Sequence, residues 1–226
     1  MLHSRSYIFI PFFLFFLGYV LLENASPDVE TSKIVGGLSA KYGNAKGWTA
    51  QYSREAISKT MAILGDVERH DVAEGKLYFK PPHLLRLEQI SPQNESLITN
   101  GETVWWYLPL KKEVYKYPAA EFGRELSLLS DVLKGLKYSE DIYRITLKKN
   151  PETEDHHIIL KRDPPWQDID HLEMIISKGD FTIKQLDIYN SIGGLTRFLL
   201  GDWKEVAANK EFFTFSPLSD VKVIDK

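Results

Sequence analysis

The sequence contains no cysteine, which excludes disulfides, thiolate metal sites and cysteine nucleophiles. It also lacks the short motifs of common catalytic sites: there is no His-Glu-x-x-His, no Gly-x-Ser-x-Gly, no phosphate-binding glycine loop and no Gly-x-Gly-x-x-Gly. Neither sign of charge dominates, because 28 Lys and Arg stand against 31 Asp and Glu. No basic cluster is dense enough to neutralise a row of phosphates, so nucleic acid is not an expected partner. These absences argue against an enzyme and against a nucleic-acid-binding protein.

The one histidine pair does not predict a metal site. His156 and His157 are adjacent, and in a strand adjacent side chains project to opposite faces, so the two cannot readily close on one metal ion. Glu154 and Asp155 precede them, which favours a solvated turn. We therefore expect no metal.

The N-terminus carries the longest apolar run. Residues 7–22 contain no charge, and a basic residue precedes them. Sixteen residues are fewer than the ~20 that a helix needs to cross a bilayer, so the run predicts a secretory signal peptide over residues 1–25 and one domain over 26–226. A cut after Ala25 leaves Glu23 where a small residue is usual, so an uncleaved anchor stays open as the alternative.

A helix is expected at the start of the mature chain. Ser26-Pro27-Asp28 suits a helix N-terminus, with a capping serine, proline in the first turn and a favourable acidic residue. Val35, Leu38 and Tyr42 then fit one helical face, and Gly43-Asn44 ends it.

Runs of strand length and strand composition make up most of the remaining chain. Their connections are too short for a crossover helix, which predicts antiparallel pairing. About ten or eleven strands are expected, with a polar hairpin turn at 69–74. The strand candidates are 48–52, 60–67, 75–82, 84–88, 97–107, 114–117, 142–148, 157–162, 172–177, 181–189 and 195–200, with shorter ones at 212–215 and 221–224.

A second helix interrupts these strands. Apolar residues recur at three- and four-residue steps between 126 and 136, and Gly135 lies near the end. An antiparallel sheet of this width must curl to hide its apolar face, and a helix with an apolar stripe can cover the open mouth. The aromatic and aliphatic side chains of the sheet then form either an ordinary core or the wall of an apolar cavity. Residue spacing does not decide between the two.

Three stretches resemble the LolA family of periplasmic outer-membrane lipoprotein carriers. Members of that family typically have Gly-x-Leu-x-x-x-x-Pro, then an apolar run with Arg or Asn and Trp, then Asp-Gly-x-x-x-Trp-x-Tyr-x-Pro, and a terminal Phe-x-Phe-x-Pro. The matching stretches here are Gly75-Lys76-Leu77-Tyr78-Phe79-Lys80-Pro81-Pro82 with Leu85-Arg86-Leu87, then Asn100-Gly101-Glu102-Thr103-Val104-Trp105-Trp106-Tyr107-Leu108-Pro109, and Phe213-Thr214-Phe215-Ser216-Pro217.

The resemblance implies an unclosed antiparallel β-barrel with helices as a lid over a hydrophobic cavity, in the α+β class. It implies a monomeric periplasmic carrier without cofactor or catalysis, which takes acylated lipoproteins from an inner-membrane lipoprotein-releasing ABC transporter to an outer-membrane acceptor similar to LolB. Burial of an acyl chain contributes roughly 0.8 kcal/mol per CH₂, so such a cargo needs an apolar container to cross water. The alternatives are a related barrel that senses or moves another lipid or a glycolipid, and, more remotely, a secreted hydrolase.

Alternation along the strands selects the residues expected to line the cavity, although a bulge could invert any one strand. The cavity candidates are Leu77, Phe79, Leu85, Leu87, Trp105, Tyr107, Tyr143, Ile145, Leu147, Leu172, Met174 and Ile176. The lid candidates are Leu129, Val132, Leu133 and Leu136.

One position departs from the family pattern. The family carries an arginine before the proline of the Gly-x-Leu strand, and its contact with the lid helices helps to hold the cavity closed. Here Pro81 occupies that position. Lys80 and Arg86 are the candidates to replace this contact.

Overall fold

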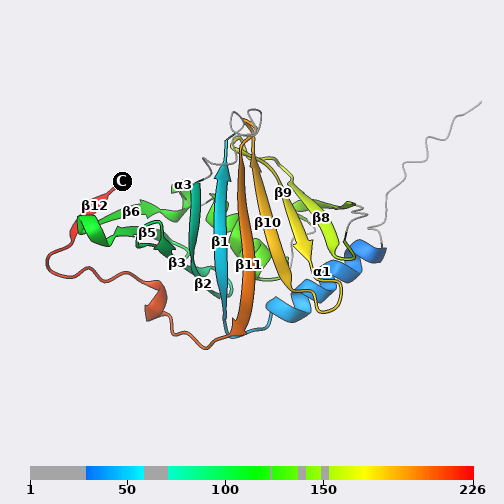
Figure 1. The fold of residues 1–226 in the computed structure, drawn as a ribbon, viewed down its shortest axis with the longest axis horizontal. Coiled ribbons are helices and arrows are strands. Elements are labelled where there is room, and N and C mark those ends of the chain that lie inside the picture. The colour runs from blue at the N-terminus through cyan, green and yellow to red at the C-terminus, as the bar shows by residue number, and fades with distance from the viewer. Residues whose placement is uncertain (1–28, 59–70, 123, 137–140, 149–152) are drawn as a thin grey trace, which may run out of the picture.

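The computed structural model describes residues 29–58, 71–122, 124–136, 141–148 and 153–226. Within these residues one sheet of twelve strands forms, in the order β12-β6-β5-β4-β3-β2-β1-β11-β10-β9-β8-β7 (Figure 1). Neighbouring strands are antiparallel, except that β12 runs parallel to β6. The strands are β1 (Trp48–Ile57), β2 (Asp71–Lys80), β3 (Leu84–Ser91), β4 (Glu95–Thr99), β5 (Thr103–Leu108), β6 (Glu113–Pro118), β7 (Tyr143–Lys148), β8 (His156–Arg162), β9 (Ile169–Ile176), β10 (Ile183–Asn190), β11 (Leu195–Glu205) and β12 (Lys222–Asp225).

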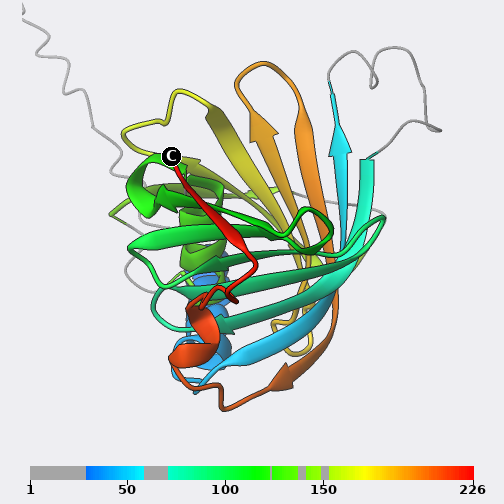
Figure 2. The ribbon, with the colours of Figure 1, turned by 90° about the vertical axis from the view of Figure 1, so that its left-hand side faces the viewer.

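The sheet curls but does not close. Its edge strands β12 and β7 are not paired with each other, so the structure is an open barrel, as expected for an antiparallel sheet of this width. Figure 2 shows the curved sheet with helices on its concave side. The predicted fold class is confirmed, with one or two strands more than expected.

Two longer helices cover the concave side. The first, α1 (Val29–Tyr42), has Glu30 in its first turn and Lys41 in its last, as the helix dipole favours, and it buries Ile34, Leu38 and Tyr42. The second, α4 (Arg124–Leu133), follows a single helical turn, α3 (Ala119–Phe122).

The two helices meet where α4 ends. Gly135 there has φ +78°, and a Cβ on it would lie 2.4 Å from the carbonyl oxygen of Leu38 in α1. Only glycine permits this backbone approach. The predicted terminator at Gly135 is confirmed, and it also serves as the contact point between the helices.

The predicted strand at 97–107 is wrong in its extent, because it is a hairpin of β4 and β5. Asn100-Gly101 forms the turn: the Asn100 Oδ1 accepts hydrogen bonds from the backbone N–H groups of Glu102 (3.0 Å) and Thr103 (2.9 Å), and Gly101 has φ +92°. Asn-Gly is a strong turn signal. Its side chain caps the turn and divides the run into two strands.

Three other predictions of local structure need correction. Of the predicted turn at 69–74, residues 71–74 belong to β2, and His156 and His157 lie in β8 rather than in a solvated turn. The expected strand at 212–215 is instead a 3₁₀ turn, η3 (Glu211–Phe213). The candidate strand at 60–67 and the N-terminal segment lie outside the described residues.

No helix among the described residues is both long enough and apolar enough to cross a membrane.

Candidate functional site

Two rows of paired residues, apolar except for the buried Thr99, line the concave face of the sheet. Cα partners share a face, so Leu77 of β2 begins a row that runs through Leu87 and Leu97 to Trp106. A parallel row runs from Phe79 through Leu85, Thr99 and Val104. The members of the core with no more than 1% exposure include Leu77, Phe79 and Leu85.

Ten of the twelve predicted cavity residues lie on this side, in the apolar cluster or packed against it. Those in the cluster come from both halves of the sheet, and those at its margin are partly buried. They are Leu77, Phe79, Leu85, Tyr143, Leu172, Met174 and Ile176 in the cluster, and Leu87, Ile145 and Leu147 at its margin.

Trp105 and Tyr107 lie on the opposite, convex face. Val104 and Trp106 take the concave positions of β5, because they pair in register with Thr99 and Leu97. The ring of Tyr107 instead packs against Phe215, with ring centroids 4.8 Å apart. The predicted face of β5 was therefore inverted.

The predicted lid stripe packs into the apolar interior. Leu129, Val132, Leu133 and Leu136 are each at most 2% exposed, and they belong to the same cluster as the sheet residues. The helix α4 therefore lies closed on the concave face.

A polar bond reinforces this closure at the edge of the sheet. The phenol of Tyr143 in β7 donates a hydrogen bond of 2.8 Å to Asp131 of α4. The Lys134 ammonium lies 2.7 Å from the other carboxylate oxygen of Asp131. Burial, the nearby Asp131 charge and this hydrogen bond raise the pKa of Tyr143, so the phenol keeps its proton at physiological pH and can donate it to Asp131.

The other helix, α1, is tied to the turn between β9 and β10. The Lys41 ammonium lies 2.8 Å from the Asp180 carboxylate and donates to the Asp180 carbonyl at 3.0 Å. The hydroxyl of Tyr42 accepts a 3.0 Å bond from the N–H of Ile183, and its ring packs against Trp203 at 5.3 Å. Hydrogen bonds from Lys41 and then from the neighbouring hydroxyls hold the pKa of Asp180 below its usual range.

A small cleft opens where α4 meets the ends of β4 and β5. Its volume is about 150 Å³, and its lining is part apolar and part polar, with Val104 and Leu126 beside Ser130 and Asp131. A cavity of about this size accepts a benzene-sized molecule. An acyl chain would not fit in this cleft unless α4 moved.

Lys80 and Arg86 do not latch the lid. Lys80 donates to the carbonyl of Ala208 at 2.7 Å. Arg86 donates to the carbonyl of Phe212 at 3.1 Å, pairs with Glu88 and stacks on the Phe212 ring. Both side chains hold the C-terminal segment against the convex face (Figure 2), and neither bonds to the described part of α4.

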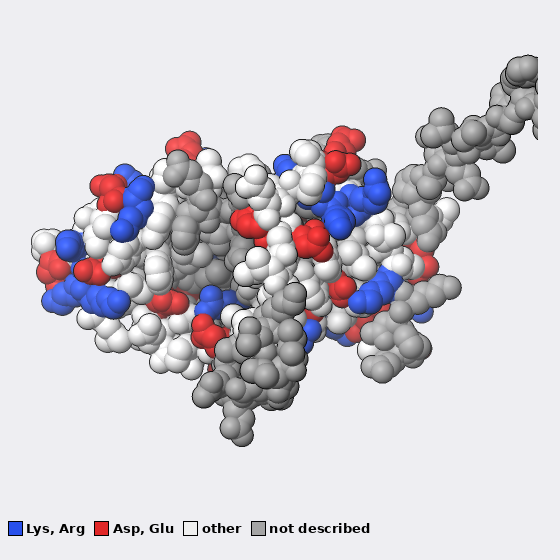
Figure 3. All heavy atoms as spheres, turned by 90° about the horizontal axis from the view of Figure 1, so that it is seen from above, with Lys and Arg blue, Asp and Glu red and all other residues white. Residues whose placement is uncertain are grey.

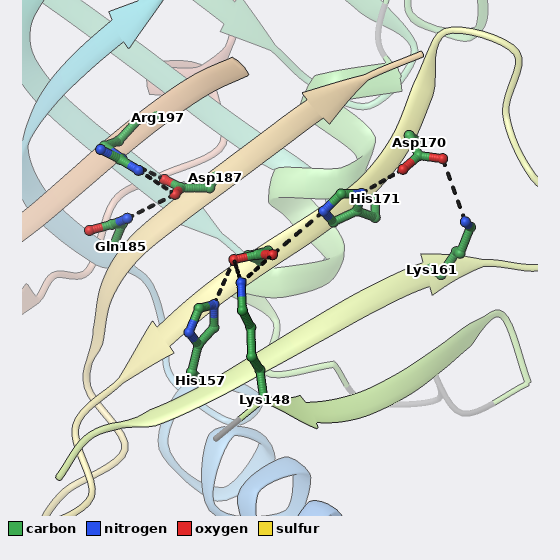
Figure 4. A network of polar contacts seen from close by, with 9 residues as sticks. Lys148, His157, Lys161, Asp170, His171, Gln185, Asp187 and Arg197 are labelled. Atoms are coloured by element: carbon green, nitrogen blue, oxygen red, sulfur yellow. Dashed lines mark hydrogen bonds and ion pairs between the residues drawn. The ribbon is translucent and has the colours of Figure 1, made fainter. Parts of the chain in front are cut away.

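The convex face of β7 to β11 carries a polar network (Figure 4). Glu173 binds Lys148 at 3.0 Å and His157 at 2.7 Å, and His171 lies 3.6 Å away. Burial raises the pKa of Glu173, but the bonds from Lys148 and His157 outweigh it and the pKa is lowered. The histidine predicted to be solvated is thus a structural partner of a buried carboxylate.

Within the described residues, neither this network nor the face shown in Figure 3 indicates a metal or a polyanion. Among the described residues, no three His, Asp or Glu side chains are arranged to hold a metal ion. On the face shown in Figure 3, basic and acidic side chains are interspersed. This distribution offers no extended basic field for nucleic acid.

Comparison with known proteins agrees with this architecture. The family model of the outer membrane lipoprotein carrier protein LolA matches residues 48–216. The chain belongs to the LolA family. An outer-membrane lipoprotein carrier protein from Pseudomonas paraeruginosa is 23% identical over 221 residues, which cover 93% of this chain and 97% of that protein.

Other LolA-family relatives match over a shorter stretch. The outer-membrane lipoprotein carrier protein of Yersinia pestis is 26% identical over 98 residues, 43% of each chain. A solved structure of an uncharacterized conserved protein from Thermus thermophilus has a TM-score of 0.53 at 14% identity, and it covers 87% of this chain and 99% of that one. That likeness shows the fold alone.

Proposed function

We propose that this chain is a periplasmic carrier that binds the acyl chains of lipoproteins between its concave sheet and α4. The observation that carries the proposal is the closed apolar stripe of α4 on the concave face of an unclosed barrel. An open sheet with a separable helical cover can take up an apolar ligand and release it, which a filled and closed barrel cannot do. Membership of the LolA family and the similarity to an outer-membrane lipoprotein carrier protein support the same function.

The proposed acyl site has two walls. The sheet wall consists of the ten concave residues predicted from the sequence, and Val104 and Trp106 replace Trp105 and Tyr107 in it. The second wall consists of Leu129, Val132 and Leu133 of α4, and of Leu136 in the turn that follows it. Each buried CH₂ of the ligand contributes roughly 0.8 kcal/mol, so the apolar walls supply the affinity without a covalent step or a cofactor.

Uptake requires α4 to move while α1 stays. The apolar stripe of α4 occupies the space an acyl chain would take, and the cleft beside it is only about 150 Å³. Lys41, Tyr42 and Trp203 tie α1 to the sheet through polar and aromatic contacts. We infer that α4 swings away about the Gly135 contact, and that Tyr143 and Asp131 separate as it does so.

The proposed route follows from the cargo. Residues 1–25 would direct export, and the mature domain would accept acylated lipoproteins from an inner-membrane ABC transporter and deliver them to an outer-membrane acceptor similar to LolB. The carrier would act as a monomer.

A displacement assay tests the proposal. Purified residues 26–226 are loaded with an environment-sensitive apolar dye, and a triacylated lipopeptide is titrated in, with the same peptide without acyl chains as the control. We expect displacement by the acylated peptide only. Failure to bind the dye and the lipopeptide would contradict the proposal, and displacement by a glycolipid alone would favour the related lipid-transporting barrels.

A further inference from the structure

A single arginine interrupts the apolar concave face of β1. The concave positions of this strand begin with Trp48, Ala50 and Tyr52, and Arg54 is next. Its Cα partners are Ala73 of β2 and Phe198 of β11, which are 0% and 4% exposed. Arg54 therefore lies at the middle of the curved sheet, on the face that the proposed ligand would contact.

Arg54 is partly buried, and one nitrogen of its guanidinium lacks a hydrogen-bond partner. Its Nε is buried and makes no hydrogen bond. Other sheet arginines differ: Arg86 pairs with Glu88 at 2.8 Å, and Arg197 forms a paired bond with Asp187 at 2.9 and 2.7 Å. Both of those pairs belong to the convex face, where polar networks are expected.

A buried Nε–H without an acceptor, between Ala73 and Phe198, can be satisfied by a ligand that enters the interior. Arginine stays charged at every accessible pH, and the buried Nε–H of Arg54 loses water without gaining an acceptor. Its planar fork fits the two oxygens of a carboxylate or a phosphate. A ligand that brings such an anion into the interior would satisfy the fork while its chain contacts the apolar rows on either side.

We propose that Arg54 binds the anionic group of an acyl ligand, so that the interior prefers acyl chains that carry a carboxylate or phosphate over neutral ones. The inference rests on the proposed acyl-binding function and adds a polar anchor to it. The neighbouring Tyr52 packs its ring against Phe198, with centroids 6.0 Å apart, and so places an aromatic side chain beside the anchor. The row from Tyr52 continues through Gly75 and Gln89 to Glu95, so the apolar chain of the ligand is expected to lie on the side of Ala73 and Phe198.

The test compares ligands with the same chain and different heads. Dodecanoic acid, its methyl ester and dodecyl phosphate each displace the dye from residues 26–226 near neutral pH. We expect the two anions to bind about tenfold more tightly than the ester, the gain of one charge-assisted hydrogen-bonding group. The ratio between dodecanoic acid and dodecyl phosphate identifies which anion the site prefers.

Variants assign the preference to the residue. Arg54→Met should lower the affinity for the two anions to that for the ester, and Arg54→Lys should keep part of the preference because the charge remains without the planar fork. Arg144→Met, which removes an exposed arginine from β7, is the matched control and should change nothing. Thermal melting confirms that each variant is folded.

The outcomes separate this inference from the function on which it rests. Equal affinity of the wild-type protein for acid and ester, or a preference that survives Arg54→Met, would overturn the role of Arg54 and leave acyl binding intact. Failure of every ligand to bind would contradict the acyl carrier itself.

Discussion

The phenol of Tyr143 and the carboxylate of Asp131 lie 2.8 Å apart and join the edge strand β7 to the lid helix α4. Tyr143 is 4% exposed, so its hydroxyl has little access to water when the lid is closed. Opening α4 must break this bond. Removing the hydroxyl oxygen of Tyr143 would therefore abolish a contact that helps to hold the lid closed.

Tyr143→Phe should loosen the lid. The loss of one buried hydrogen bond costs about 1 kcal/mol, so amide exchange in α4 should accelerate severalfold while exchange in the sheet stays the same. Hydrogen exchange followed by mass spectrometry measures this. Tyr189→Phe is the control, because Tyr189 stacks on His171 at 4.4 Å on the convex face, away from the lid. Equal acceleration in both variants would contradict a specific lid contact.

Bridging α4 to the sheet should block ligand uptake. The natural chain has no cysteine, so Asp131→Cys and Tyr143→Cys together provide two unique thiols at the lid contact. A short bis-maleimide linker should hold α4 closed and abolish binding of the apolar dye. A linker of equal length with a reducible disulfide should restore binding after reduction.

The single-cysteine variants, treated with the same reagents, control for modification alone. Dye binding at the wild-type rate in the bridged protein would show that ligand enters without movement of α4.

Acid should weaken the attachment of α1. The pKa of Asp180 is held below the unfolded value of about 3.9, first by the bond from Lys41. A lowered folded-state pKa stabilises the protein fully above the unfolded pKa, and this stabilisation is lost as the pH falls through the folded value. Asp180→Asn should therefore lower the melting temperature near pH 7, and its difference from the wild type should shrink below about pH 3.

Asp202→Asn, which removes an exposed carboxylate from β11, is the control. Asparagine tolerates the positive φ of 51° at that position. A deficit of Asp180→Asn that stayed constant from neutral to acid pH would contradict the ionic origin of the contact.

The helical parts of the site could be predicted because their periodicity is unambiguous. The apolar stripe of α4 recurs at three- and four-residue steps in the sequence, and all four predicted lid positions, including Leu136 just after the helix, are buried. The concave faces of β2 and β9 were also predicted correctly, because the alternate residues of these strands are more polar. In β2 and β9 the alternation of apolar and polar residues therefore identifies the concave face.

The face of β5 could not be predicted, because both of its faces are covered. The C-terminal segment packs on the convex side of β2 to β6, where Ile98 and Val114 are 1% and 0% exposed. Apolar residues then occur on both faces, and Trp105-Trp106 has no alternation to read. The prediction of a solvated turn at His156-His157 was wrong because both lie within β8. His157 bonds to Glu173 in the convex network, and His156 is buried beside the ring of Phe181.

The C-terminal segment on the convex face is anchored by one buried side chain. Phe213 in η3 is 0% exposed, whereas Leu218 further along the same segment is 70% exposed. Phe213→Ala should destabilise the protein by about 3–5 kcal/mol, because it leaves a cavity between the C-terminal segment and the convex face. Leu218→Ala, the matched control, should lie within about 0.5 kcal/mol of the wild type.

Urea unfolding measures both values, and limited proteolysis locates the effect, with cleavage expected first between residues 206 and 221. Hydrogen exchange in α4 should stay at the wild-type rate, because Phe213 lies on the face of the sheet opposite α4. A small effect of Phe213→Ala, equal to that of Leu218→Ala, would show that the segment does not hold the convex face. Faster exchange in α4 would show that the two faces are coupled.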